Sequence, residues 1–115
     1  MLSKKELSLY DISYTEQLII CALYQRELYG LAIQDHVKRS SNNEIKIEAG
    51  SLYPALAKLE RKGLVNSRWG ENRPNERRGA RRKYYTLTSK GITMSDEIFE
   101  FLNRLRNCYP LLDPT

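Results

Sequence analysis

The fold of this chain is decided by one stretch, Ile47-Glu-Ala-Gly-Ser-Leu-Tyr-Pro-Ala-Leu-Ala-Lys-Leu-Glu-Arg-Lys-Gly-Leu-Val65, which predicts a short helix with a defined start and end. A proline is tolerated in the first turn of a helix, where its missing N–H has no intrahelical partner to lose. Pro54 therefore predicts a helix that begins near Gly50 or Ser51, with Ser51 as its cap. Gly63 predicts the end of the helix.

The two faces of this predicted helix differ in chemistry. Leucines at i, i+4 and i+7 predict one buried face, made of Leu52, Leu56 and Leu59. The opposite face is small, aromatic and basic, and it contains Tyr53, Pro54, Ala57, Lys58 and Arg61. A short helix of this kind can enter a DNA major groove, but it is equally compatible with a surface helix of any small domain.

The excess positive charge of the chain is concentrated in one segment. The 115 residues carry a formal net charge of +5. Residues 68–83 contain seven basic and two acidic side chains, so the rest of the chain is neutral overall. This distribution favours a local anion-binding element over a generally basic surface, with a solvated charge run as the alternative.

Length and composition predict one small globular domain. A chain of 115 residues can bury one modest core, and domains of this size often gain stability by oligomerising. Cys21 and Cys108 match no metal-ligand spacing; Cys21 lies in an apolar run that predicts burial, and a redox role for Cys108 stays open. No signal peptide is visible and the longest apolar run, Leu18 to Tyr24, is too short to span a bilayer, which predicts a soluble cytoplasmic protein.

Two helices are expected before the central stretch. Ser13-Tyr-Thr-Glu16 forms a capping box ahead of a helix from about Tyr14 to Gln25, which is apolar around much of its circumference and therefore expected to be central. Leu28-Tyr-Gly30 opens a second helix, which runs roughly from Gly30 to Arg39, and Gly30 allows close approach to a neighbour. Ile45-Lys-Ile47 alternates and predicts a very short strand.

A hairpin and a terminal helix are expected after the central stretch. Residues Leu64 to Trp69 and Arg82 to Leu87 predict two strands, and the glycine- and arginine-rich segment Gly70 to Ala80 predicts the long charged tip between them. Residues Ile92 to Asn107 predict the terminal helix. The order helix, helix, short strand, helix, hairpin, helix is that of a winged helix-turn-helix, a mainly α fold with a small β-hairpin (α+β).

These elements divide the chain into four parts. Residues 1–12 form an N-terminal extension, residues 13–89 the winged helix-turn-helix DNA-binding domain, residues 90–108 a C-terminal dimerisation helix, and residues 109–115 an irregular tail. The terminal helix has an apolar stripe broader than this small core needs. We expect the stripe to form a dimer interface made of Met94, Ile98, Phe101, Leu102 and Leu105, which Leu7, Leu9 and Tyr10 could extend if the first twelve residues are helical.

Four motifs resemble the PadR-like transcriptional regulators. They are Leu28-Tyr-Gly-Leu-Ala-Ile33, Gly50-Ser-Leu-Tyr-Pro-Ala-Leu56, Leu59-Glu-Arg-Lys-Gly-Leu64 and Arg81-Arg-Lys-Tyr-Tyr-Thr-Leu-Thr88. The resemblance runs from about Thr15 to Gly91, and the single terminal helix is similar to that of short-tailed members. It implies a bacterial homodimer, usually a repressor, that binds inverted-repeat operators through the winged helix-turn-helix and dimerises largely through the C-terminal helix.

The expected contacts with double-stranded DNA lie on the central helix and in the hairpin, or wing. On the helix, hydroxyl groups suit phosphates, small apolar side chains suit thymine methyls, and Lys58 could reach a base edge or a phosphate. The helix residues are Ser51, Tyr53, Pro54, Ala57, Lys58 and Arg61. In the wing, arginines at the tip suit the narrow minor groove, while Arg82 and Lys83 suit flanking phosphates. The tip arginines are Arg73, Arg77, Arg78 and Arg81, and Tyr29 matches a family position near the DNA backbone, with packing as its alternative role.

Other function classes are less well supported. The sequence offers no nucleophile–base pair, no carboxylate pair in a plausible pocket, no metal set and no phosphate-binding glycine loop, so neither an enzyme nor a cofactor is expected. A winged-helix module that docks on proteins is the main alternative, and RNA binding is a weaker one. Some family members bind flat aromatic compounds at the dimer interface; here Trp69 lies beside the wing, so a small-molecule effector stays unassigned.

Overall fold

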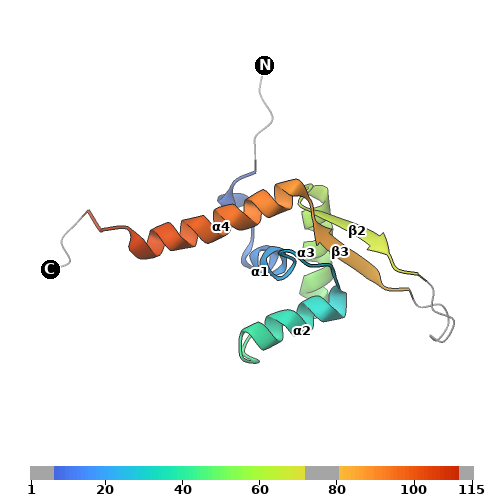
Figure 1. Cartoon of the computed structure of the whole chain (residues 1–115). Helices are drawn as coiled ribbons and strands as arrows, with labels where there is room; N and C mark the ends of the chain where they lie inside the picture. Colours follow the sequence, from blue (N-terminus) through green and yellow to red (C-terminus); the bar gives the residue numbers. More distant parts are fainter. Residues whose placement is uncertain (1–6, 72–80, 112–115) are drawn as a thin grey trace, which may run out of the picture.

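A computed structural model describes residues 7–71 and 81–111, which form four α-helices around a small antiparallel sheet (Figure 1). The mainly α, α+β class is confirmed, and the four helices and the hairpin follow one another in the predicted order. The elements are the 3₁₀ helix η1 (Leu9–Asp11), α1 (Tyr14–Ala22), β1 (Leu28–Tyr29), α2 (Gly30–Ser40), α3 (Ala49–Arg61), β2 (Val65–Trp69), β3 (Lys83–Leu87) and α4 (Ser89–Asn107). None of the helices in the described ranges is both long and apolar enough to cross a membrane.

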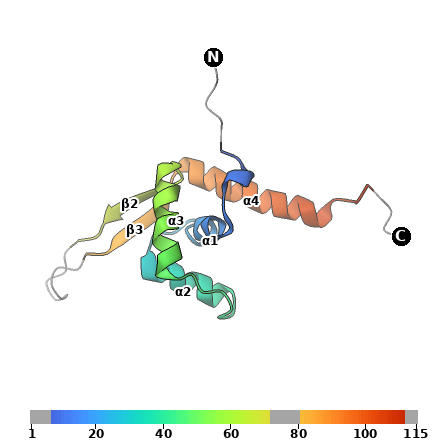
Figure 2. The same ribbon diagram turned by 180° about the vertical axis from the view of Figure 1, so that it is seen from behind.

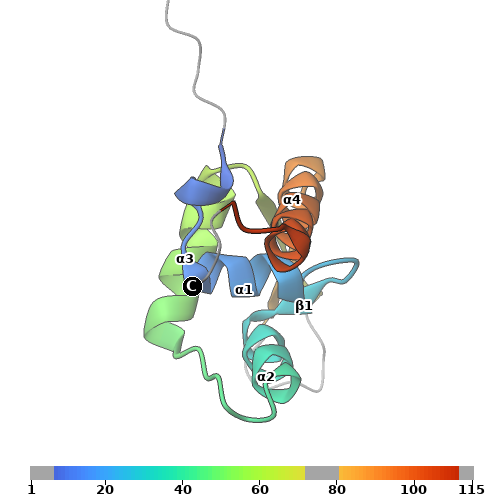
Figure 3. The ribbon, with the colours of Figure 1, turned by 90° about the vertical axis from the view of Figure 1, so that its left-hand side faces the viewer.

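Helix α1 is central, as its all-round apolar character predicts: α2, α3 and α4 all contact it (Figure 3). The predicted capping box is present, since the Glu16 N–H donates to Ser13 Oγ at 3.1 Å and the Ser13 N–H donates to Glu16 Oε1 at 2.9 Å. The helix ends at Ala22, earlier than predicted, because the chain turns through Gln25 with a φ of 58°. Cys21 is exposed, so the prediction that it is buried is wrong; its apolar surroundings still raise the pKa of its thiol.

The sheet has the strand order β1-β3-β2, so it contains one strand that the sequence did not predict and lacks one that it did. Leu28 and Tyr29 pair with Tyr85 and Tyr84 of β3 and form the additional strand, and α2 begins at Gly30, as predicted. The strand predicted at Ile45–Ile47 is absent; Ile47 is buried and its carbonyl accepts a hydrogen bond from Gln34 Nε2 at 2.8 Å. A strand needs a neighbour to pair with, and local alternation cannot show where that neighbour lies.

Helix α3 starts earlier than Pro54 predicts. Glu48 is its N-cap residue, and the N–H groups of Ser51 and Leu52 both bond to the Glu48 carbonyl at 2.9 Å, so the predicted Ser51 cap is wrong. Pro54 therefore lies in the second turn and deprives the Gly50 carbonyl of its helical donor. Both residues are exposed, so water can satisfy that carbonyl, and the cost is small beside the burial of the leucine face. The leucine face of α3, Leu52, Leu56 and Leu59, is buried as predicted, and each residue is at most 1% exposed.

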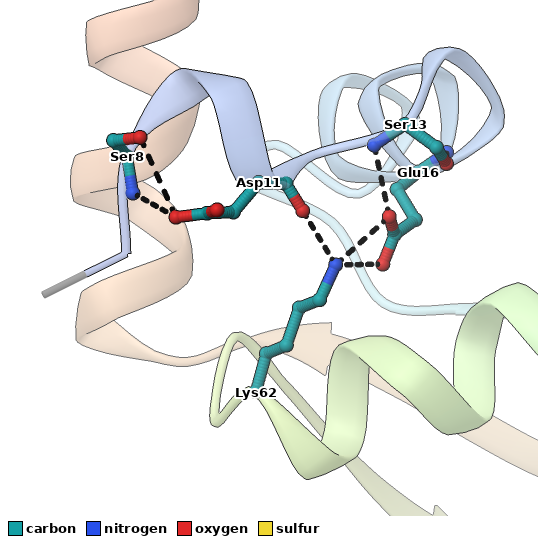
Figure 4. A network of polar contacts seen from close by, with 5 residues as sticks. All are labelled: Ser8, Asp11, Ser13, Glu16 and Lys62. Atoms are coloured by element: carbon teal, nitrogen blue, oxygen red, sulfur yellow. Dashed lines mark hydrogen bonds and ion pairs between the residues drawn. The ribbon is translucent and has the colours of Figure 1, made fainter. Parts of the chain in front are cut away.

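A polar network joins the N-terminal segment, α1 and the end of α3 (Figure 4). Lys62 Nζ donates to both carboxylate oxygens of Glu16, at 2.7 and 2.9 Å, and to the Asp11 carbonyl at 2.7 Å. Glu16 is only 3% exposed. Burial alone would raise the pKa of this carboxyl, but the hydrogen bonds from Lys62 and Ser13 outweigh burial and leave the pKa below its usual value.

Helix α4 begins at Ser89, three residues before the prediction, because Thr88 caps it: the Gly91 N–H donates to Thr88 Oγ1 at 3.0 Å. A side chain at Gly91 would collide with the Leu64 carbonyl, so glycine permits the close approach of α4 to the segment between α3 and β2. Met94 and Ile98 are each 4% exposed and belong to the protomer's own core, so assigning them to a dimer interface is wrong. The C-terminal half of α4 is exposed and projects past the other helices (Figure 1).

Candidate nucleic-acid interface

The outer face of α3 is open to solvent and lies beside the hairpin formed by β2 and β3 (Figure 2). Each side chain assigned to this face from the sequence is exposed: Ser51, Tyr53, Pro54, Ala57, Lys58 and Arg61. The leucine face fixes the rotation of the helix, because it packs on α1 and faces the core. At the end of α3 the helix is tied to the wing, since Ser67 Oγ of β2 donates to Glu60 Oε2 at 2.9 Å.

Tyr53 is positioned by a glycine on another helix. Its ring and hydroxyl lie where a Cβ atom at Gly30 would be, so only glycine at the start of α2 allows this approach. The close approach predicted for Gly30 is therefore confirmed, and Tyr53 is the neighbour. Tyr53 keeps 46% of its surface exposed, which leaves it able to contact a ligand while one side of the ring is supported.

Gly30→Ala tests this support. We expect the variant to fold with a stability within about 1 kcal/mol of the wild type, because the new methyl collides with the far end of a flexible side chain and alanine favours the helix. Tyr53 must move, however, and DNA affinity should fall about tenfold, as for the loss of one hydrogen bond to a charged group. Gly50→Ala is the stability control, since a Cβ there meets nothing within 4 Å. Unchanged DNA affinity in a folded Gly30→Ala protein would remove Tyr53 from the interface.

Aromatic rings and arginines alternate across the sheet. The Tyr29 ring on β1 meets the Tyr84 ring on β3 edge to face, with centroids 5.7 Å apart. The Arg82 guanidinium lies 4.5 Å from the centroid of Tyr29, and that of Arg68 lies 4.9 Å from the centroid of Tyr84. Contacts of this kind are worth about 0.5–1 kcal/mol at exposed sites. Tyr29 thus has the packing role that was its alternative, although a backbone contact would still be compatible with its partial exposure.

Trp69, at the end of β2, holds a second pair of cations. Its ring is 55% exposed, and the Arg81 guanidinium and Lys83 Nζ lie 5.6 and 5.5 Å from its centroid. Lys83 is half-buried and Arg81 is exposed. Contact with the Trp69 ring restricts the long side chains of Arg81 and Lys83, so their charges are held close to the strands. The predicted residues Arg73, Arg77 and Arg78 lie outside the described ranges.

The ion pair between Glu27 and Arg68 was not predicted from the sequence. Glu27, just before β1, accepts two hydrogen bonds from Arg68 of β2, at 2.6 and 2.7 Å. The hydrogen bonds lower the pKa of Glu27 and raise that of Arg68. The pair spans 41 residues of sequence, and no local pattern could have indicated it. Glu27 therefore neutralises Arg68, one of the basic residues of the charged segment. Arg68 joins β2 to the residues before β1 and is not a free cation.

Comparison with known protein families gives one match that covers most of these elements. The model of the transcriptional regulator PadR-like family matches residues 19–97. Among solved structures, a PadR family transcription regulator from hypervirulent Clostridium difficile R20291 aligns with a TM-score of 0.62 at 28% identity, over 83% of this chain and 96% of that chain.

Two further proteins are longer than this chain. The HTH-type transcriptional regulator SarZ of Staphylococcus haemolyticus is 30% identical over 98 residues, which are 79% of this chain and 58% of SarZ. Bacillus subtilis PadR, whose structure is a complex with operator DNA, aligns with a TM-score of 0.63 at 23% identity, over 90% of this chain and 52% of that chain. At this identity the second likeness shows the fold alone.

Proposed function

This chain belongs to the PadR-like family of transcriptional regulators, and on that premise we propose that it represses transcription by binding an inverted-repeat operator as a homodimer. The observation that carries the proposal is the placement of two elements side by side: the exposed face of α3, and the hairpin that bounds the segment holding the excess positive charge. A helix and a charged wing in this relation match a major groove and the minor groove next to it. The operator complex of Bacillus subtilis PadR, which has the same fold, supports this reading.

The helix residues take different roles in this proposal. Ser51 and Tyr53 donate to phosphates and set the register of α3 on the duplex. Pro54 and Ala57 present apolar atoms to thymine methyl groups, and Lys58 reaches a base edge or a phosphate. Arg61 is further from the start of α3 and contributes charge near the flanking backbone. The base edges that these side chains read define the half-site.

The wing supplies charge to the minor groove and its borders. Arg81 and Arg82 immediately precede β3, Lys83 is its first residue, and all three face flanking phosphates in this proposal. The tip arginines Arg73, Arg77 and Arg78 enter the groove itself, where the potential is most negative. In the homodimer, Phe101, Leu102 and Leu105 of α4 contact a second copy, and the two-fold axis turns one half-site into an inverted repeat.

The experiment that tests the proposal is a salt titration on a duplex selected from a random library. A DNA-binding protein should lose affinity steeply with salt, and each lost phosphate contact should reduce the log–log slope by about 0.9. We expect Lys58→Ala and Arg81→Ala to weaken binding and to flatten the slope. Arg39→Ala, which removes an exposed charge at the far end of α2, is the control and should leave the slope unchanged.

A protein-docking module predicts another result. Such a module would bind DNA weakly, with little dependence on salt and no preferred sequence after selection. If the selected duplexes contain no inverted repeat and both variants match Arg39→Ala, the repressor proposal fails.

A further inference from the structure

An apolar hollow lies along one flank of α4 and is open to solvent. Its volume is about 490 Å³. It is bordered by Leu7 and Leu9 of the N-terminal segment and by Phe101 and Leu102 of α4. Two oppositely charged side chains of α4, Glu97 and Arg104, line the same hollow.

The two charges are arranged to complement a second copy of the same helix. Glu97 and Arg104 are seven residues apart, so they lie two turns apart on the same flank of α4. That separation is about 10 Å along the helix, too far for the two side chains to pair with each other. Both are exposed, and no ion pair joins either of them to another residue within 7–71 or 81–111.

From this arrangement we propose that two copies of α4 pair antiparallel along this flank, with Glu97 of each protomer against Arg104 of the other. The inference rests on the proposed homodimer and adds its orientation and register. In an antiparallel pair, residues on the same flank of the two helices face each other, and a two-fold axis near Phe101 brings position 97 of one opposite position 104 of the other. The hollow then receives the partner's α4, and Phe101 packs close to the axis.

The remaining features of α4 agree with this pairing. Leu102 and Leu105 are 51% and 64% exposed on the half of α4 that projects past the other helices (Figures 1 and 2). The contact is isologous, so one self-complementary patch serves both protomers and the assembly closes as a dimer. A parallel pairing would set this flank against the opposite flank of the partner and leave both charges without these partners.

Charge exchange tests the register, with sedimentation equilibrium at about 50 mM salt, where surface ion pairs are little screened. Glu97→Arg alone and Arg104→Glu alone each replace two attractive contacts with two repulsive ones. We expect each to raise the dimer dissociation constant about tenfold or more. The double variant E97R/R104E restores both pairs and should return to the wild-type constant.

A mixture of the two single variants gives a sharper result. A heterodimer of the E97R and R104E chains has two complementary contacts, so labelled E97R protein should bind unlabelled R104E protein about as tightly as the wild type binds itself. Circular dichroism checks that each variant is folded. Wild-type chains that sediment as monomers would overturn the homodimer itself. A wild-type dimer whose constant is the same in all variants and in the mixture would keep the homodimer and overturn the antiparallel register.

Discussion

Leu102→Asp is expected to convert the proposed homodimer into monomers and to weaken binding to a two-half-site operator by about 100-fold or more, because two linked half-sites gain that much from avidity. Leu102 is half exposed in the protomer and borders the hollows on both flanks of α4. A carboxylate there would have to be buried against a second copy without a partner. The protomer's own core does not depend on this side chain, so the monomer should fold.

The measurements are sedimentation equilibrium and a DNA titration on the same samples. Asn103→Asp is the matched control, because it adds the same charge at the next position, which lies about 100° further round the helix. It should leave both the mass and the affinity near the wild-type values. Sedimentation of Leu102→Asp as a dimer would contradict the assignment of α4 to the interface.

Lys62→Met is expected to have the largest effect on stability, about 3 kcal/mol at pH 7. Removing one partner of a buried ion pair leaves an uncompensated charge, which typically costs 3–5 kcal/mol. The lower end applies because the Lys62 side chain is 23% exposed, although Glu16 is almost fully buried. The variant also loses the contact of Lys62 with the Asp11 carbonyl, so η1 should loosen from the end of α3.

The pH dependence gives a second readout of this ion pair. The folded state lowers the pKa of Glu16 below its ordinary value of 4.5. The ionised carboxylate therefore contributes fully to the free energy of unfolding above that pH, and this contribution is lost as pH falls through the folded pKa. In Lys62→Met the pKa of Glu16 should rise, because the hydrogen bonds from Lys62 no longer oppose the effect of burial. The stability gap between the two proteins should therefore narrow as pH falls from 7 towards 4.

Urea denaturation at each pH measures the difference in unfolding free energy between the wild type and Lys62→Met. Lys46→Met is the control, because Lys46 is exposed and the same side chain is replaced. It should change the unfolding free energy by less than about 0.5 kcal/mol. If Lys62→Met is as stable as Lys46→Met at pH 7, the network in Figure 4 does not stabilise the fold.

Local patterns predicted most of the helices and the hairpin. The leucine spacing of α3, the capping box of α1 and the strand content of β2 and β3 each depend on residues close together in sequence. The errors arise where distant residues decide the structure. β1 exists because β3 pairs with it. The early start of α4 is different, because its signal, the Thr88 cap, is local and was overlooked.

The candidate interface was predictable in composition but not in detail. The exposed face of α3 follows from the position of its buried face, so its residues could be assigned from periodicity. The support of Tyr53 by Gly30 and the neutralisation of Arg68 by Glu27 could not, because each joins segments far apart in the chain. The same limit explains why Met94 and Ile98 were wrongly assigned to a dimer interface. An apolar stripe in the sequence does not show which of its residues the protomer itself buries.

The strand order β1-β3-β2 has a consequence for synthesis on the ribosome. The middle strand, β3, is the last of the three to be synthesised. Leu28 of β1 therefore cannot pair with Tyr85 until the residues between them have been added to the chain. At about 5–20 residues per second, this delay is roughly 3–11 s. Helices α2 and α3 close within themselves well before then, since a helix forms in about a microsecond. The first strand therefore remains an unpaired edge during translation, and the sheet is completed only when β3 has emerged between its two neighbours.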